Sequence, residues 1–209
     1  MIDHSLAIQI GRILQIASGG FWIIAYLLIL YKGFQDRKSG MPLAAICANI
    51  TWEAIFTLLF PIDATQTIIN FVWLALDFLI LLQYLAYSKM TPNKYFIVAA
   101  SLAAAFLINL GITVEFQDWI GRYTAFGMNF MMSLLFILLL QSQGTLGQSI
   151  YIGYAKFLGS LCASVIFYYL FPNSSLLLIL ISFITILDIV YIILLKQSAV
   201  KRVGYMFHK

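Results

Sequence analysis

The sequence predicts an all-α integral membrane protein with seven transmembrane helices, and two observations support this prediction. Hydrophobic residues make up 63% of the 209 residues and charged residues only 10%, whereas about a quarter of the residues in soluble domains are charged. The hydrophobic residues also form seven runs of about 18 to 22 residues, the length with which an α-helix crosses the hydrocarbon core of a bilayer.

The runs follow one another with short connections, so we expect one membrane domain over residues 1–209 and no separate soluble domain. The alternation of polar and apolar residues that marks a membrane β-strand is absent, and a helix satisfies its own backbone groups inside lipid. The N-terminal residues lack the basic region and cleavage site of a signal peptide, so we expect the first helix to be retained. The expected helices are residues 13–32, 42–60, 67–87, 95–113, 121–140, 149–170 and 175–195.

Charged residues in the connections predict the orientation of the helices. Basic residues occupy the first connection, the third connection and the C-terminal tail, as Lys32, Arg37, Lys38, Lys89, Lys94, Lys196, Lys201, Arg202 and Lys209. The second and fourth connections instead carry Asp63, Glu115 and Asp118. Because basic connections stay in the cytoplasm, we expect the N-terminus outside and the C-terminus inside. The tail is too sparsely charged to indicate nucleic-acid binding.

An internal repeat relates the two halves of the chain. Residues 59–61 and residues 170–172 both read Leu-Phe-Pro, and Asp77 and Asp188 match at the same offset of 111 residues. The match predicts a parallel duplication, in which helices 1 to 3 and 5 to 7 form two bundles joined by helix 4. Asp77 and Asp188 would then occupy equivalent positions beside a central cavity.

Three acidic residues lie well inside expected helices and are the candidate catalytic residues. Glu53 and Asp77 are ~15 Å from the start of their helices, and Asp188 is ~12 Å from the cytoplasmic end of the last helix. An acid at such depth costs roughly 2.5 to 3.5 kcal/mol to insert, a cost usually offset by a partner or a functional cavity. The alternative is that these carboxyl groups only join helices through hydrogen bonds.

Candidate substrate-binding residues are the polar and aromatic side chains near these acids, several of which share a helical face with them. Electron-rich rings can stabilise a cation in an apolar cavity, although any single ring can also serve only for packing. The amide and hydroxyl groups can likewise make ordinary hydrogen bonds between helices. The candidates are Asn49, Trp52, Trp73, Asn70, Tyr84, Thr185 and Tyr191.

A carboxyl group buried without a cation keeps its proton at neutral pH and can serve as an acid. Lys156 is a possible cationic partner, but we expect its ammonium group to extend to the cytoplasmic head groups. We expect no metal site and no cofactor, because the sequence has no DDxxD-like run, HExxH, P-loop, Cys/His cluster or GxSxG motif.

The stretch "GMPLAAICANITWE", residues 40–53, resembles the second-helix signature of the small integral-membrane terpene cyclases. This is the family of the paxilline and pyripyropene cyclases, which act in fungal meroterpenoid and indole-diterpene pathways and have bacterial relatives. "VWLALD", "GQSIYIGYAKFLGS" and "LDIVYI" in the third, sixth and seventh helices extend the resemblance over most of the chain. Family members are seven-helix proteins that cyclise prenylated, often epoxidised, substrates without a metal.

The resemblance implies specific roles for the buried acids. The family has two essential acidic residues, which correspond to Glu53 and Asp188, and Asp77 matches a third-helix acid. Protonated Glu53, alone or hydrogen-bonded to Asp188, would protonate a terminal epoxide or alkene, and rings would close through a cation. A carboxylate or water would then remove the final proton.

The expected partners are a prenylated small molecule and the bilayer, with no obligate protein partner evident. The host membrane would be the plasma membrane in a bacterium and the endoplasmic reticulum in a fungus. Two alternatives stay open on sequence grounds. In a small-solute facilitator with the same helix repeat, Asp77 and Asp188 would bind the solute as a symmetric pair. In a non-catalytic membrane scaffold, all three acids would tolerate replacement by amides.

Overall fold

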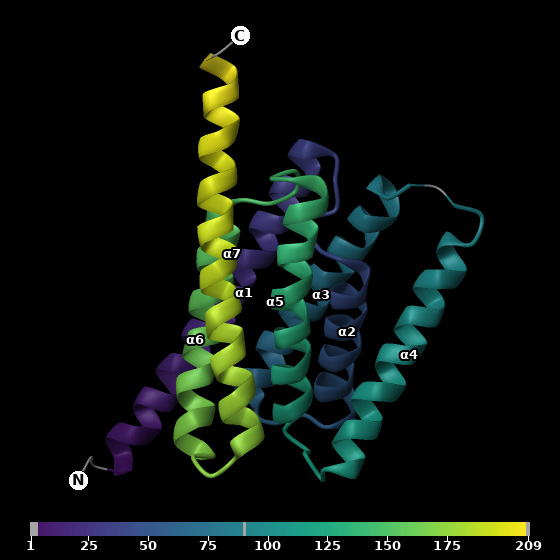
Figure 1. Ribbon diagram of the computed structural model, residues 1–209. Helices are drawn as coiled ribbons and strands as arrows, with labels where there is room; N and C mark the ends of the chain where they lie inside the picture. The colour runs from purple at the N-terminus through teal and green to yellow at the C-terminus, as the bar shows by residue number, and fades with distance from the viewer. Residues whose placement is uncertain (1–3, 90, 208–209) are drawn as a thin grey trace.

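The structure, a computed structural model, describes residues 4–89 and 91–207. Seven α-helices account for most of these residues and form one elongated bundle (Figure 1). They are α1 (His4–Asp36), α2 (Leu43–Ala54), α3 (Ala64–Tyr87), α4 (Lys94–Glu115), α5 (Arg122–Gln143), α6 (Ile150–Leu170) and α7 (Ser175–Phe207). The predicted all-helical architecture is confirmed.

Six of the helices in the described chain are long and apolar enough to cross a membrane, and α2 is the exception. It has 12 residues and continues through a π-helical turn of 5 residues, η1 (Ile55–Leu59). Together they reach ~26 Å, somewhat less than the ~30 Å of a hydrocarbon core. Pro42 precedes the first turn and Pro61 follows the last. Proline has no backbone N–H and its ring clashes with the preceding turn, so it fits at the start of a helix or just after its end but not in its interior. The span predicted over 42–60 is therefore a helix, but a short one.

The first and last helices are longer than predicted. Hydropathy placed them at 13–32 and 175–195, whereas α1 and α7 each have 33 residues. Hydropathy identifies only the part of a helix that is apolar enough to lie in the hydrocarbon core. The helical backbone of α1 and α7 continues beyond that part into more polar sequence.

The helices pack as two groups of three with α4 at the edge. In the first group, α3 contacts both α1 and α2, and in the second, α7 contacts both α5 and α6. The groups meet where α1 packs along α6, the most extensive helix contact, and where α2 contacts α5. Helix α4 lies against α2 and leans away from the bundle (Figure 1). The space between the two groups is where a central site can form.

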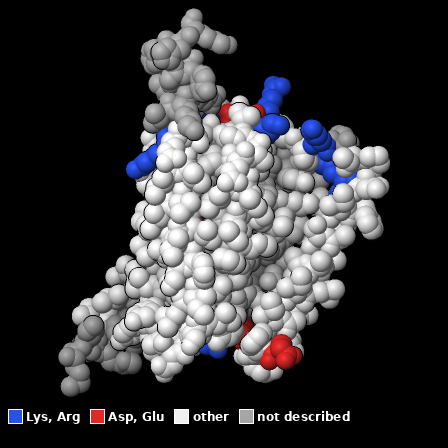
Figure 2. Space-filling model, viewed as in Figure 1, with Lys and Arg blue, Asp and Glu red and all other residues white. Residues whose placement is uncertain are grey.

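Charged side chains gather at the two ends of the bundle, with an apolar belt between them on the face shown in Figure 2. We call the end with the α1–α2, α3–α4 and α5–α6 connections the basic end, since it carries Arg37, Lys38 and Lys89. The opposite end has the α2–α3, α4–α5 and α6–α7 connections, and we call it the acidic end for its Asp63 and Asp118. The belt between them is the surface that suits lipid.

Close packing of α1 on α6 depends on Gly159, which leads to a prediction about stability. A Cβ atom at this position would lie 2.7 Å from the Trp22 ring, whereas one at Gly111, on the outside of α4, would meet nothing within 4 Å. We expect Gly159→Ala to lower the free energy of unfolding by about 1 to 3 kcal/mol through overpacking. Thermal unfolding of the detergent-solubilised protein measures the effect, and Gly111→Ala is the matched control. Equal melting temperatures for the two variants would contradict the close contact.

Candidate active site

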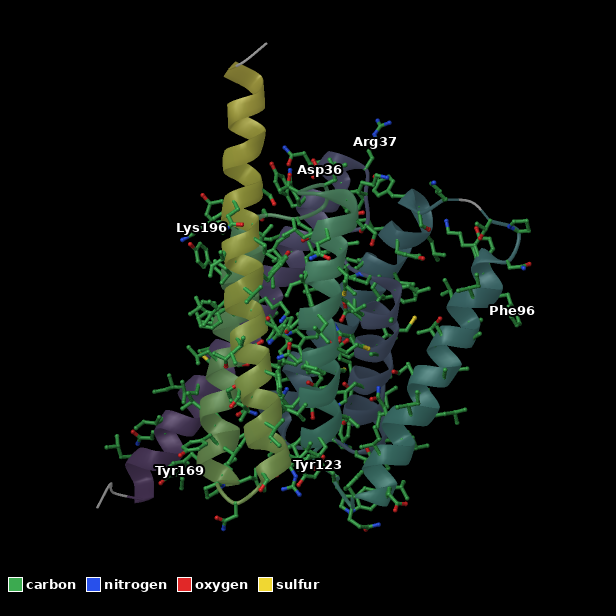
Figure 3. All side chains as sticks on the ribbon, in the orientation of Figure 1. Asp36, Arg37, Phe96, Tyr123, Tyr169 and Lys196 are labelled. Carbon is green, nitrogen blue, oxygen red and sulfur yellow. The ribbon has the colours of Figure 1, made fainter. Side chains whose placement is uncertain are left out.

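A cavity of about 750 Å³ lies between the two groups of helices. Its wall is formed by α1, α2 and α3 on one side and by α5 and α6 on the other, and most of it is apolar. Gln15, Asp63 and Tyr169 line the cavity near the acidic end, where Figure 3 shows Tyr169 opposite to Arg37. Tyr26, which also lines the cavity, lies 11 residues beyond Gln15 on α1, or ~17 Å deeper. The cavity thus runs from the acidic end to the middle of the bundle.

Glu53 lies at the inner end of this cavity. Its side chain lines the wall beside Tyr26 and Asn49, although only 1% of the residue is accessible. It projects from α2 just before the π-helical turn begins at Ile55. Such turns are frequent at functional sites, because one extra residue per turn re-aims the side chains around it. A molecule filling the cavity would therefore meet a carboxyl group in its inner part.

Asp77 lies directly behind Glu53. The two carboxyl groups are near neighbours, and the hydroxyl group of Tyr26 lies beside both. Asp77 is fully buried, and none of its carboxyl oxygens has a hydrogen-bond donor in conventional geometry among the described residues. Two carboxyl groups this close in an apolar interior cannot both ionise, so the pair holds at least one proton.

Asn49 and Tyr26 orient this acid pair. The amide of Asn49 donates a hydrogen bond of 2.9 Å to the Tyr26 oxygen. Since that oxygen already accepts a hydrogen bond, the hydroxyl proton of Tyr26 is available to the two carboxyl groups. The arrangement can stabilise a single negative charge on the pair once a proton has left it.

Asp188 has a different environment. Its Oδ1 atom lies 2.5 Å from Nζ of Lys156, and both side chains are 1% exposed. The hydroxyl of Ser133 donates to the same oxygen at 2.8 Å and accepts from Lys156 at 2.7 Å. The prediction that Lys156 extends to the head groups is wrong, because this acid and hydroxyl hold its ammonium group in the interior. A hydrogen bond between Glu53 and Asp188 is likewise not formed, since Asp188 is held by Lys156 and Ser133 while Glu53 adjoins Asp77.

The Lys156–Asp188 pair reaches the cavity through Asn129. Nζ of Lys156 donates to Oδ1 of Asn129 at 3.2 Å, and the Asn129 amide donates to Ser160 at 2.9 Å. Asn129 lines the cavity, whereas neither member of the ion pair does in the described part of the chain. Trp22, another lining residue, has its ring centre 5.7 Å from the Lys156 ammonium. The buried pair thus supports the wall of the cavity from behind.

Three of the candidate substrate-binding residues line the cavity, namely Asn49, Trp52 and Trp73. The indole of Trp52 donates to the Thr124 hydroxyl at 3.0 Å, and that of Trp73 donates to the Gly19 carbonyl at 3.2 Å. These hydrogen bonds fix the orientation of both rings against the cavity.

The other four candidates lie away from the cavity wall as the structure describes it. Asn70 accepts a hydrogen bond of 2.8 Å from Gln66, and Thr185 donates to the Ile181 carbonyl of its own helix. Tyr191 donates to Gln148 at 2.8 Å, and Tyr84 packs against the core. Their contacts are those of residues that join or stabilise helices.

Sequence reasoning missed Tyr26, Asn129 and Ser133. Tyr26 is a tyrosine near the middle of an apolar helix and not at its interfacial end, where most such residues lie. Asn129 and Ser133 are polar residues one turn apart in an otherwise apolar helix. Both patterns were signals of a polar interior. No group of three or more His, Cys, Asp or Glu among the described residues has an arrangement that could hold a metal ion.

Comparison with known proteins places the chain among terpene cyclases. Residues 3–200 match the family of Pyr4-like transmembrane terpene cyclases. Similar relatives include the Pyr4-family terpene cyclase mfmH of Annulohypoxylon moriforme, 30% identical over 82% of this chain and 76% of the relative. Terpene cyclase macJ of Penicillium terrestre is 30% identical over 73% of this chain and 64% of its own length.

Terpene cyclase andB of Emericella variicolor is 29% identical over 72% of this chain and 69% of its own length. The match therefore spans about two thirds to three quarters of the length of these three relatives. No solved structure matches it. The resemblance that the second-helix signature indicated is confirmed by the family match.

The buried ion pair predicts non-additive effects on stability. Lys156→Met leaves Asp188 buried without its cation, and Asp188→Asn leaves Lys156 without its anion. We expect each to lower the free energy of unfolding by about 3 to 5 kcal/mol, and the double variant to lose much less than the sum. Thermal unfolding in one detergent measures the three variants, with the exposed Lys196→Met as control. Additive losses would mean that the two side chains do not form a pair.

Proposed function

The chain belongs to the family of Pyr4-like transmembrane terpene cyclases, and from this premise we propose the reaction that it catalyses. It is a membrane-bound cyclase that protonates a terminal epoxide or alkene of a prenylated, meroterpenoid-type substrate and closes rings through a carbocation. The observation that carries this proposal is the position of Glu53, an acid at the inner end of a largely apolar cavity with a second acid behind it.

The acid pair starts the reaction in its neutral form. Neither Glu53 nor Asp77 forms a salt bridge among the described residues, so the pair has no cation to favour ionisation. Glu53 gives its proton to the epoxide oxygen or the terminal alkene carbon. In the epoxide a C–O bond breaks and leaves a hydroxyl group, and in the alkene the π electrons form a new C–H bond; either way a tertiary carbocation forms. Asp77 keeps its proton and donates it as a hydrogen bond to the new Glu53 carboxylate.

Tyr26 and Asn49 stabilise the charge that this transfer leaves behind. The Tyr26 hydroxyl lies beside both carboxyl groups and is oriented by Asn49, so its dipole is in place before the proton moves. Donors that are fixed in advance in a dry site lower the barrier without having to reorganise. In this scheme Asn49 positions the Tyr26 hydroxyl group, and Asp77 positions the carboxyl group of Glu53.

The cation moves along the substrate as successive alkenes attack it, and aromatic walls stabilise it on the way. Trp22, Trp52 and Trp73 line the same cavity as Glu53. A ring face within reach of a desolvated cation is worth about 2 kcal/mol. Loss of a proton to the Glu53 carboxylate, or to water, ends the reaction and restores the acid. One proton enters and one leaves, so the product is an isomer of the substrate.

Asp188 contributes through the residues that it holds. It is paired with Lys156, and the pair positions Asn129 and adjoins Trp22 on the cavity wall. We therefore assign Asp188 a positioning role and place the proton transfer on Glu53, with Asp77 as its hydrogen-bonding partner. The facilitator reading has no support from the cavity, because Asp77 and Asp188 both lie outside its described lining.

The arrangement of the helices supports two further parts of the proposal. In the first group α3 packs on α1 and α2, and in the second group α7 packs on α5 and α6, as a parallel repeat predicts. Under this repeat α1 matches α5 and α2 matches α6, so the contact of α1 with α6 corresponds to the contact of α5 with α2. The basic end faces the cytoplasm under the positive-inside rule, so the outer end of the cavity lies in the opposite half of the bilayer (Figure 2).

The proposal is tested by Glu53→Gln, which keeps the shape of the side chain and removes its acid. Membranes with the wild-type or variant protein are incubated with prenylated aromatics and their terminal epoxides. Products are analysed by chromatography and mass spectrometry for isomers of unchanged mass. We expect the wild type to form an isomer and Glu53→Gln to lose at least 10²- to 10⁴-fold in rate, roughly the contribution of a general acid.

Glu115→Gln is the control, since Glu115 is an exposed acid outside the cavity lining. It should form product at the wild-type rate. Full activity of a folded Glu53→Gln variant would refute the assignment of the acid.

Asp77→Asn separates the roles of the two acids. An amide at this position can still donate a hydrogen bond to the Glu53 carboxylate, but it cannot share a proton with it. We expect a smaller loss of rate than for Glu53→Gln, together with a changed pH dependence of the rate. The pH–rate profiles of the wild type and Asp77→Asn measure this difference, and identical profiles would show that the two acids are not coupled.

A further inference from the structure

A group of three polar side chains lines the outer end of the cavity, and the proposed reaction does not use it. Nε2 of Gln15 donates to Oδ2 of Asp63 and to Oε1 of Gln66, each at 3.1 Å. Oδ1 of Asp63 accepts from the backbone amide of Gln66 at 3.0 Å and so caps α3. Gln15, Asp63 and Gln66 all line the cavity. We call them the outer polar group.

The outer polar group and Glu53 lie toward opposite ends of the same cavity, and Asp77 adjoins Glu53 just behind the wall. Gln66 and Asp77 are both on α3, 11 residues apart, which corresponds to ~17 Å along the helix. Between these levels the wall carries Trp22 and Trp73. A ligand that uses both ends must be long and mainly apolar with one polar end, since the wall between the two ends is mostly apolar and aromatic.

The charge of the outer polar group determines which polar end fits. Partial burial would raise the pKa of Asp63, but hydrogen bonds from the Gln66 amide and the Gln15 side chain outweigh it and hold the pKa below its usual value. The exposed Arg12 lowers it further. Asp63 is therefore ionised at neutral pH and accepts hydrogen bonds only.

The two glutamines add neutral amides, which can donate as well as accept. A carboxylate or phosphate on the ligand would face the negative charge of Asp63, whereas a hydroxyl or ring N–H would find an acceptor. Asp63 is exposed, and each of its oxygens has a second lone pair beyond the hydrogen bonds it already accepts.

On the premise of the proposed function, we propose that Gln15, Asp63 and Gln66 bind the polar head group of the prenylated substrate, and that this head group is uncharged and donates hydrogen bonds. The head group lies at the acidic end of the bundle, and the last isoprene unit reaches Glu53. The enzyme thereby selects substrates by head group at a site remote from the reacting carbon atoms.

Binding is measured separately from turnover through tryptophan fluorescence, because Trp22, Trp52 and Trp73 line the cavity. The full-length protein in lipid nanodiscs is titrated with three probes, farnesyl hydroquinone, farnesylbenzene and 4-farnesylbenzoate. Each affinity is corrected for the partition of that probe into protein-free nanodiscs, so that affinities can be compared between variants and between probes. The Glu53→Gln protein is titrated as well, since it should bind without reacting.

We expect the wild type to bind farnesyl hydroquinone about tenfold more tightly than farnesylbenzene, as a hydrogen bond to a charged group provides, and the benzoate most weakly. An asparagine at position 63 can still cap α3. We expect Asp63→Asn to abolish most of the preference for farnesyl hydroquinone over farnesylbenzene and to tighten binding of the benzoate. Gln15→Met, which leaves Asp63 in place, should weaken hydroquinone binding. Glu115→Gln should leave all three affinities unchanged.

Unchanged preferences in Asp63→Asn, a wild-type preference for the benzoate, or no binding of any probe would each overturn the head-group assignment. The terminal epoxides of the same probes separate this assignment from the reaction. Cyclisation without head-group discrimination would leave the cyclase standing and remove the subsite. Discrimination without cyclisation would support the subsite and refute the proposed reaction.

Discussion

An acid inside a bilayer must either keep its proton or find a cation, and the interior of this protein follows from that constraint. The three buried acids meet it in two ways. Glu53 and Asp77 adjoin each other without a cation, so they hold at least one proton between them. Asp188 instead has a cation, Lys156, as its partner. In the proposed reaction, the first solution supplies the proton that starts cyclisation, whereas the second supplies an ion pair that supports the cavity wall. Under that proposal, acidic residues serve chemistry in one helix group and structure in the other.

The cavity depends on both solutions, because it lies between the two helix groups. The first group brings Glu53, Tyr26 and Asn49 to its inner end, and the second brings Asn129, held by Lys156. Helix α1 joins them, since it packs along α6 and places Trp22 against Gly159. A rigid ion pair behind one wall keeps that wall in place while charge forms at the other. This division suits a reaction in which the substrate must be folded before the proton is transferred.

The gradient of polarity along the cavity completes the arrangement. Polar side chains at its outer end can hold a head group in partly hydrated surroundings, and the wall beyond them is mainly apolar and aromatic. An amphiphilic substrate dissolved in the membrane has the same gradient, so it can enter tail first without losing favourable contacts. In the proposed reaction this direction of entry delivers the far end of the prenyl chain to Glu53, while Gln15, Asp63 and Gln66 hold the polar end at the outer end of the cavity.

The sequence by itself determined the all-helical class, the approximate positions of the helices and the three buried acids, because hydropathy and residue depth are properties of a single segment. It also indicated the family, through the residues around Pro42 and Glu53. Only the tertiary structure decided which acid adjoins which group. Spacing along a helix identifies neighbours on that helix, but the pairing of Glu53 with Asp77, and of Asp188 with Lys156, depends on how separate helices rotate and pack. For the same reason Asn49, Trp52 and Trp73 reach the cavity, whereas Tyr84, Thr185 and Tyr191 lie away from its wall.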